Sequence, residues 1–326
     1  MTETESAVGR LTGLGASRLK EGTHRVLVVG AGGWLGLATL ELLHRLLGAE
    51  AFAKRVLAFG SQARELTLRE GVTVHQRPLS ELAKLPSALS LVLHNAFLTQ
   101  EKAKAMSEAD YSAVNRGISR QVLDALDPIG ACGVFVPSSG AVYKVDDPTA
   151  QASMRLYGRL KLEDEAAFSA WAGAQPGRRA AIARVFNLSG PYINKQSSYA
   201  LACFINDALA GRPIEIKATS PVYRSFVAIS ELMSVVFGVL TDGDHGAVTF
   251  DTAGDHDYEM SEIAEAVIGV LGVKGIVKRA AIENNGGDRY LGGAELFRGH
   301  RRRICAAPVS FAEQILETSA YLSVAG

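Results

Sequence analysis

The chain has 326 residues, of which 48% are hydrophobic and 21% are charged. This composition is typical of a large globular α/β protein and excludes disordered and fibrous architectures. Lysine plus arginine and aspartate plus glutamate both number 34, so the formal net charge is zero. Without surplus positive charge to neutralise a phosphate backbone, we expect no nucleic-acid partner.

The first 22 residues show no clear helix or strand pattern. They include four glycines and lack the basic start and apolar core of a signal peptide, so we interpret residues 1–22 as a flexible leader. Residues 26–40 are apolar and uncharged, but they number only 15 and include four glycines, whereas a spanning helix needs roughly 20 residues. We therefore expect a cytoplasmic protein with no membrane partner.

The three cysteines, Cys132, Cys203 and Cys305, lie far apart and form no CxxC pair. Such spacing indicates neither a disulfide framework nor a zinc site, and it favours a reducing compartment. The histidines have no partners at ligand spacing, so we expect no metal.

Residues 23–186 alternate between short apolar runs and helical patterns. The predicted strands are residues 24–29, 55–59, 72–75, 89–93, 133–136 and 181–186, and the clearest helices are residues 34–47, 111–126 and 156–172. Continuous apolar strands that alternate with helices predict a parallel sheet covered on both faces. We therefore expect a Rossmann-type doubly wound α/β domain, with its ligands beyond the carboxyl ends of the strands.

The regular alternation of strands and helices ends after residue 186. Helices are predicted over residues 199–210, 230–240 and 261–271, and strands over residues 213–216 and 247–251, without sustained strand–helix alternation. We interpret residues 187–326 as a smaller C-terminal α/β lobe that covers the substrate, with a boundary interleaved with the first domain.

A glycine-rich turn follows the first predicted strand and opens the first helix. Residues 30–36 read GAGGWLG, with glycines three residues apart at Gly30, Gly33 and Gly36. Such a turn lets the backbone approach a pyrophosphate closely and aims amide N–H groups of a helix N-terminus at its negative charge. The turn therefore predicts a dinucleotide-binding site.

A tyrosine and a lysine stand one helical turn apart further along the chain. Tyr157 and Lys161 form a YxxxK pattern on a predicted helix, where an ammonium beside a phenol lowers the pKa of the phenol. Upstream, the predicted strand at residues 133–136 leads into SSGAVY, so that Ser139 lies where a parallel sheet presents its active site. A hydroxyl there can donate to a substrate oxygen that gains negative charge.

Together these segments resemble the extended short-chain dehydrogenase/reductases, in the branch of nucleotide-sugar epimerases, dehydratases and reductases. The likeness rests on GAGGWLG, on HNA at residues 94–96, AVNRG around Asn115, SSGAVY, YGRLK, RVFNLSGP at residues 184–191 and YRSFV at residues 223–227. It implies that Tyr157 is the acid/base, that Lys161 tunes it and holds the nicotinamide ribose, and that Ser139 is the hydroxyl partner.

The resemblance also implies the binding residues. Asn187 and Arg224 would contact the diphosphate of a nucleotide-sugar substrate. The cofactor would be bound by Gly30, Gly32, Gly33, Trp34, Leu35, Gly36, Ser61, Arg64, Asn95, Ala96, Asn115, Tyr157 and Lys161.

Two departures from the family pattern bear on which cofactor is bound and which reaction is catalysed. NAD-preferring members end the second strand with an aspartate, whereas this chain has Gly60 followed by Ser61 and, three residues on, Arg64. Because these residues suit a 2′-phosphate, we expect NADP, with NAD as the alternative. The segment SSGAVY lacks the two carboxylates with which dehydratases catalyse elimination, so simple hydride chemistry remains.

We therefore expect NADPH-dependent reduction of a nucleotide-linked 4-keto sugar. The alternative is a nucleotide-sugar 4-epimerase that uses tightly bound NAD and the same residues. A third hypothesis, a cofactor-sensing protein without catalysis, is disfavoured because the Tyr/Lys pair is present. By resemblance, we also expect a homodimer formed through the helices at residues 111–126 and 156–172.

Overall fold

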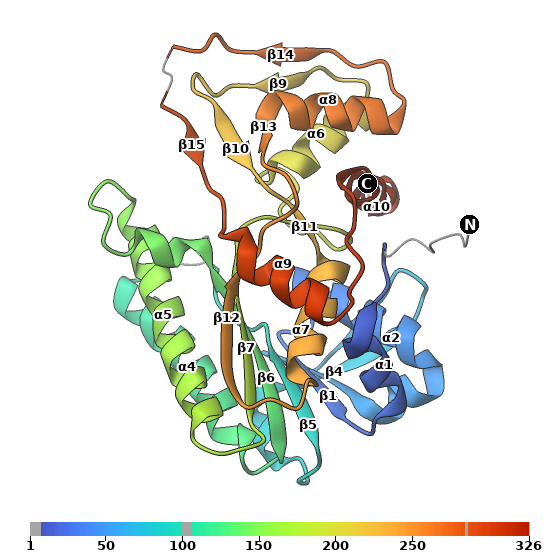
Figure 1. The fold of residues 1–326 in the computed structure, drawn as a ribbon, viewed down its shortest axis with the longest axis vertical. Helices are drawn as coiled ribbons and strands as arrows, with labels where there is room; N and C mark the ends of the chain where they lie inside the picture. Colours follow the sequence, from blue (N-terminus) through green and yellow to red (C-terminus); the bar gives the residue numbers. More distant parts are fainter. Residues whose placement is uncertain (1–7, 100–105, 284–285, 326) are drawn as a thin grey trace.

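The computed structural model describes residues 8–99, 106–283 and 286–325 (Figure 1). Its centre is an eight-stranded sheet in the order β12-β7-β6-β5-β1-β2-β4-β3, in which every neighbouring pair is parallel except β3 with β4. The strands are β1 (Arg25–Val29), β2 (Val56–Gly60), β3 (Arg64–Thr67), β4 (Thr73–Pro78), β5 (Ser90–His94), β6 (Ala131–Ser139), β7 (Arg179–Val185) and β12 (Gly246–Asp251). The prediction of a Rossmann-type doubly wound sheet is confirmed.

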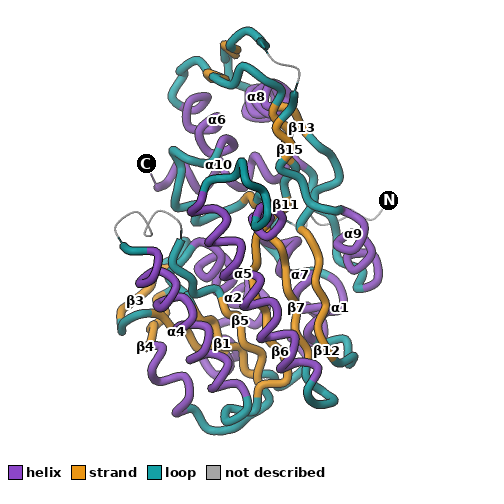
Figure 2. The backbone as a smooth tube through the Cα atoms, turned by 90° about the vertical axis from the view of Figure 1, so that its left-hand side faces the viewer, coloured by secondary structure: helices purple, strands orange, loops and turns teal. Residues whose placement is uncertain are grey.

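The central strands are buried on both faces, which explains their continuous apolar sequences. In β1, Val26 and Val28 face one core cluster, and Leu27 and Val29 face the other. The helices around the sheet are α1 (Gly13–Glu21), α2 (Trp34–Arg55), α4 (Glu108–Leu126), α5 (Ala152–Gly173) and α7 (Ile229–Leu240). Helices α4 and α5 lie side by side over one face, and α2 and α7 cover the other (Figures 1 and 2).

The interpretation of residues 1–22 as a flexible leader is wrong for residues 13–21, which form α1. This helix packs against α7 and buries Leu19 completely. Gly15 lies so close to the backbone of Gly238 in α7 that a Cβ atom on Gly15 would overlap it. Gly15, one of the glycines that suggested a loose segment, instead permits two helices to approach closely.

The edge strand β3 and its hairpin to β4 are absent from the predicted elements. Strand β3 has four residues, RELT, of which only Leu66 is buried. The connection turns at Gly71, whose φ of +76° suits glycine. A short, charged edge strand lacks the apolar run that marks the inner strands.

The second lobe stands beyond the carboxyl ends of the strands (Figure 1). Its elements are β8 (Leu188–Ser189), α6 (Ala200–Leu209), β9 (Ile214–Ile216), β10 (Val222–Arg224), β11 (Val227–Ala228), β13 (Tyr258–Glu259), α8 (Met260–Leu271), β14 (Val277–Arg279), β15 (Asp288–Arg289) and α10 (Phe311–Ala325). Between them the chain returns to the first domain, since α7 and α9 (Ala294–Arg303) pack beside the sheet and β12 pairs with β7.

Two short 3₁₀ helices, η1 (Leu79–Lys84) and η2 (Gly140–Lys144), follow β4 and β6. Within the described residues, no helix is both long and apolar enough to span a membrane.

Candidate active site

The glycine turn lies between the ends of β1 and β5. Gly30 has a φ of +78°, and a Cβ atom there would lie 2.6 Å from the backbone nitrogen of Ala96. A Cβ atom on Gly36 would overlap the carbonyl oxygen of Gly30. Helix α2 begins at Trp34 directly after Gly33 and has no side-chain cap, so the amides at its start are exposed to a ligand.

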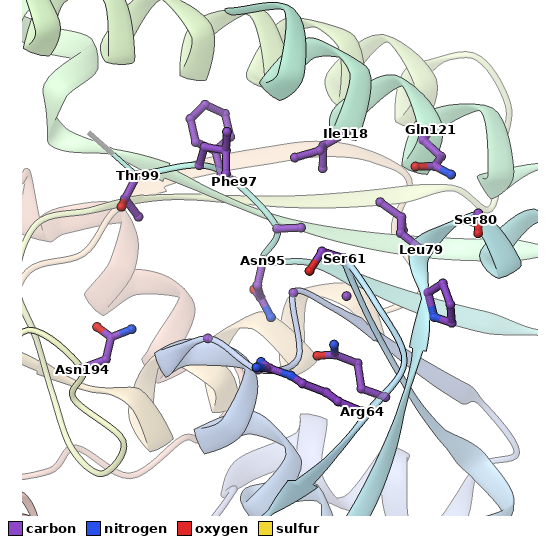
Figure 3. A pocket seen from close by; sticks show the side chains of 18 of the residues that line it. Ser61, Arg64, Leu79, Ser80, Asn95, Phe97, Thr99, Ile118, Gln121 and Asn194 are labelled. Carbon is purple, nitrogen blue, oxygen red and sulfur yellow. The ribbon is translucent and has the colours of Figure 1, made fainter. Parts of the chain in front are cut away.

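A cavity of about 720 Å³ opens beside this turn (Figure 3). The structure places seven of the residues predicted to bind the cofactor in its wall: Gly30, Gly32, Gly33, Ser61, Arg64, Asn95 and Ala96. The guanidinium of Arg64 reaches the glycine turn, where it lies against Gly32. Ser61 directly follows Gly60, the last residue of β2, and both residues line the cavity.

A second cavity of about 270 Å³ continues on the far side of the turn. Trp34, Leu35, Gly36, Tyr157 and Lys161 line it, and all five were predicted from the sequence. The two cavities together run from the end of β2 to the Tyr157 phenol, as an extended dinucleotide requires.

Asn95 and Asn115 behave differently. Both polar atoms of the Asn95 amide are buried and have no hydrogen-bond partner among the described residues, although the residue lines both cavities. Such orphaned groups fit a polar ligand. Asn115 lines neither cavity, because its Oδ1 accepts from the Leu98 amide at 2.7 Å and its Nδ2 donates to the Tyr111 carbonyl at 3.1 Å. It therefore supports the cavity wall from behind.

The catalytic candidates meet at the end of β6. The hydroxyl of Ser139 lies near the phenols of Tyr157 and Tyr290 and acts to lower the pKa of each, against the larger effect of burial. Burial raises the pKa of Tyr157 above its ordinary value of 10, so the phenol keeps its proton at neutral pH. Tyr290, from the segment before α9, packs on the Phe186 ring with centroids 4.8 Å apart.

Lys161 is buried beneath this group. Its ammonium donates to the Pro137 carbonyl at 2.9 Å and lies 3.6 Å from the centroid of the Phe97 ring. Burial lowers the pKa of Lys161 to about 8, while Asp164 and Glu165 oppose that shift. Lys161 is therefore a cation at neutral pH, 5.8 Å from the centroid of the Tyr157 ring.

The glycine between Tyr157 and Lys161 explains how α5 reaches β6. A Cβ atom on Gly158 would overlap the carbonyl oxygen of Ala141 in η2. Only glycine therefore allows this turn of the helix to approach the segment after Ser139 closely enough for Tyr157 to meet the serine hydroxyl.

A polar network fixes the strand ends around Ser139. Glu165 of α5 accepts from the Ser138 hydroxyl at 2.5 Å and from Arg184 of β7 at 2.7 and 2.9 Å. Arg184 also donates to the Tyr143 hydroxyl at 2.9 Å, and that hydroxyl donates to Asp251 at 2.9 Å. The network ties β6, β7 and β12 together at the edge that carries the site.

The two predicted substrate contacts lie further out. Asn187 donates to the Ser225 carbonyl at 3.3 Å and lines neither cavity. Arg224 forms an ion pair with Asp288 at 2.7 Å and lies over the Tyr290 ring, 5.9 Å from its centroid. The Tyr290 ring therefore lies between Arg224 and Ser139. The contact of Arg224 with a substrate stays a prediction.

Several lining residues were not singled out from the sequence. Phe97 directly follows the HNA segment, so the rule that ligands bind after strand ends could have found it. Asn194 and Lys195 lie in a loop of the second lobe, and no local pattern marks them. The same is true of Tyr290, which lines neither cavity but lies near Ser139. Among the described residues, no group of three histidine, cysteine or carboxylate side chains converges as a metal site would require.

A glycine turn at the start of α2, a dinucleotide-sized cavity and a Ser/Tyr/Lys group at the strand ends define the class of short-chain dehydrogenase/reductase folds. The family model described as "NAD dependent epimerase/dehydratase family" matches residues 26–251. The chain belongs to this family of enzymes.

Comparison with individual proteins gives more distant matches. UDP-glucuronic acid decarboxylase 3 of Arabidopsis thaliana is 29% identical over 93 residues, which are 28% of this chain and 27% of that protein. The match therefore spans about a quarter of the relative's length.

Two solved structures share the fold along most of the chain. One is a UDP-N-acetylglucosamine 4-epimerase from Methanobrevibacter ruminantium in complex with UDP-N-acetylmuramic acid, with a TM-score of 0.70, 17% identity, and coverage of 93% of this chain and 99% of that one. The other is a Thermus thermophilus UDP-glucose 4-epimerase in complex with NAD, with a TM-score of 0.65, 20% identity, and coverage of 93% and 100%.

Proposed function

We propose that the protein is an oxidoreductase that uses NADPH to reduce the 4-keto group of a nucleotide-linked sugar. The observation that carries this proposal is the end of β2, where Gly60 replaces a carboxylate and Ser61 and Arg64 line the cavity. A 2′-phosphate there would meet a guanidinium and a hydroxyl, and no negative charge from position 60.

The residues present can hold a dinucleotide. The glycine turn and the start of α2 would take the pyrophosphate, Ser61 and Arg64 the adenosine ribose, and Lys161 the nicotinamide ribose. The unpartnered Asn95 amide supports this assignment. When bound, the nicotinamide supplies the hydride.

The side chains around the second cavity would deliver a proton to the keto oxygen of the substrate. Ser139 orients the keto oxygen, and Tyr157 donates the proton that converts this oxygen to a hydroxyl. Because burial raises its pKa, Tyr157 is already in the protonated form that reduction needs. The Lys161 ammonium stabilises the phenolate that remains after the transfer.

The proposal is tested by mixing the purified protein with NADPH or NADH and UDP- or dTDP-linked 4-keto sugars, and following absorbance at the reduced-nicotinamide band. We expect NADPH oxidation by at least one of these sugars. Retained NAD in the purified protein, with no NADPH oxidation on any of them, would contradict the proposal.

The alternative is a 4-epimerase with tightly bound NAD, which is favoured by the two solved epimerases with this fold. The same Tyr157, Lys161 and Ser139 would then act in both half-reactions. Net turnover of the cofactor separates the two functions, because an epimerase consumes none. A protein that only senses the cofactor would need neither Tyr157 nor Lys161, so this third function is the least supported.

We further propose a homodimer that buries α4 and α5. These helices pack side by side on one face of the sheet, where Arg116 and Glu163 form an exposed ion pair at 2.7 Å. Light scattering coupled to size-exclusion chromatography measures the oligomeric state, and a monomer at micromolar concentration would refute the dimer.

A further inference from the structure

We propose that Lys195, in the loop that leads into α6, binds the pyrophosphate of the dinucleotide from the side opposite the glycine turn. This inference rests on the proposed function, because it needs a dinucleotide in the two cavities. It makes a residue of the second lobe part of the cofactor site.

The first argument is the position of Lys195 along the cofactor's path. Seven residues line both cavities: Gly30, Gly33, Asn95, Phe97, Thr99, Asn194 and Lys195. A ligand that extends from one cavity into the other must pass these residues, and two of them belong to the turn that receives a pyrophosphate. Figure 3 shows the neighbouring Asn194 entering the cavity from the end away from Ser80 and Gln121.

The second argument is that the loop is fastened to the glycine turn at both of its ends. The indole Nε1 of Trp34 donates to the Pro191 carbonyl at 2.8 Å. The same indole meets the Tyr199 ring edge to face, with centroids 5.3 Å apart. Because Trp34 is the first residue of α2, one side chain sets the distance between the phosphate-binding amides and residues 191–199.

The backbone of the loop then places Lys195 between these two anchors. The amides of Ser198 and Tyr199 both donate to the Lys195 carbonyl, at 2.9 and 3.2 Å. The residue is therefore held in a turn at the start of α6. These two hydrogen bonds fix the backbone of Lys195.

The third argument is charge. A pyrophosphate carries two negative charges, and the first turn of α2 supplies only backbone amides, since residues 34–37 read WLGL. Of the seven residues shared by both cavities, Lys195 alone is ionisable, whereas Arg64 belongs to the adenosine end and Lys161 to the nicotinamide end. In a protein of zero net charge, a local cation adds to the attraction that these backbone amides provide.

The test compares Lys195→Met with Lys195→Arg and with Lys54→Met, a control on an exposed lysine at the far end of α2 that pairs with Glu50 at 2.7 Å. The readout is the Kd of NADPH from quenching of intrinsic fluorescence, measured from 50 to 300 mM salt. We expect Lys195→Met to raise Kd about tenfold at low salt, as loss of a charge-assisted hydrogen bond does, and to flatten its salt dependence. Lys195→Arg and Lys54→Met should stay within about twofold of the unaltered protein.

The outcomes distinguish this inference from the proposed function. If the unaltered protein binds neither NADPH nor NADH, both fail. If it binds NADPH and Lys195→Met binds equally well, only the assignment of Lys195 fails. If Kd for NADPH is unchanged while KM for the keto-sugar nucleotide rises, Lys195 belongs to the substrate, which also overturns the inference.

Discussion

Replacing Gly60 by aspartate tests the proposed preference for NADPH, and the structure predicts that this single substitution destabilises the protein. A Cβ atom on Gly60 would overlap the side-chain amide of Gln76, which is buried and donates to the Gln62 carbonyl at 2.8 Å. Overpacking of this kind costs about 1–3 kcal/mol. With roughly 2.1 cal/mol/K of unfolding entropy per residue, the midpoint of thermal unfolding should fall by about 1.5–4.5 °C.

Truncating the Gln76 side chain should allow an aspartate at position 60 to shift the preference from NADPH toward NADH. The overlapping atoms all lie beyond Cβ of Gln76, so Gly60→Asp combined with Gln76→Ala makes room for the carboxylate. A carboxylate roughly 5 Å from a 2′-phosphate repels it by about 3 kcal/mol at an effective dielectric constant of 20. Because solvent weakens this repulsion, we expect the ratio of the Kd values for NADPH and NADH to rise by about ten- to a hundredfold.

The assay is titration of NADPH and NADH into the unaltered protein, each single variant and the double variant, followed by nicotinamide fluorescence. Gln76→Ala alone is the control and should leave the ratio of the two Kd values unchanged. The reasoning is refuted if Gly60→Asp alone unfolds at the unaltered midpoint, or if the double variant keeps the original ratio.

Three further predictions concern the catalytic group and the first helix. Tyr157→Phe should lower kcat by about 10²- to 10⁴-fold while the Kd of NADPH changes less than twofold, and a full rate would remove Tyr157 from the mechanism. Burial lowers the pKa of Lys161 to about 8 from 10.5, so the native protein binds fewer protons than the unfolded chain between these values and its stability rises with pH there. Lys161→Met should therefore raise the unfolding midpoint at pH 7, lose this advantage by pH 10.5 and abolish turnover, and a lower midpoint at pH 7 would contradict the burial argument. Leu19→Ala should cost about 2–5 kcal/mol in urea unfolding because Leu19 is fully buried, whereas a cost below 0.5 kcal/mol would fit the loose leader.

Much of the sheet could be predicted from the sequence because its strands are buried on both faces. The interiors of β1 and β5 read as unbroken apolar runs, and β7 is apolar from residue 180 to residue 183. The ends of these strands place the glycine turn and the residues after β5 at one edge. The Tyr/Lys spacing on α5 and the serine at the end of β6 depend on the same local geometry. These features need only the period of a helix or strand and the order of elements.

The remaining features depend on contacts between distant segments. Helix α1 has few apolar residues and exists because Gly15 allows it to pack on α7. The partner of Arg224, Asp288, lies 64 positions further along the chain. Tyr290 and Lys195 reach the site only through the way the second lobe docks, so no local spacing marks either residue.

The return of the chain from the second lobe to the sheet has a consequence for biogenesis. Strand β7 gains its outer neighbour, β12, only when residues 246–251 have been synthesised, and α7 covers the same side of the sheet from residues 229–240. During translation, a chain that ends at residue 186 would present an unpaired strand edge and an uncovered apolar face. The first domain thus completes its own sheet only after residues up to 251 have left the ribosome, and expression of residues 23–186 alone would produce an aggregation-prone fragment.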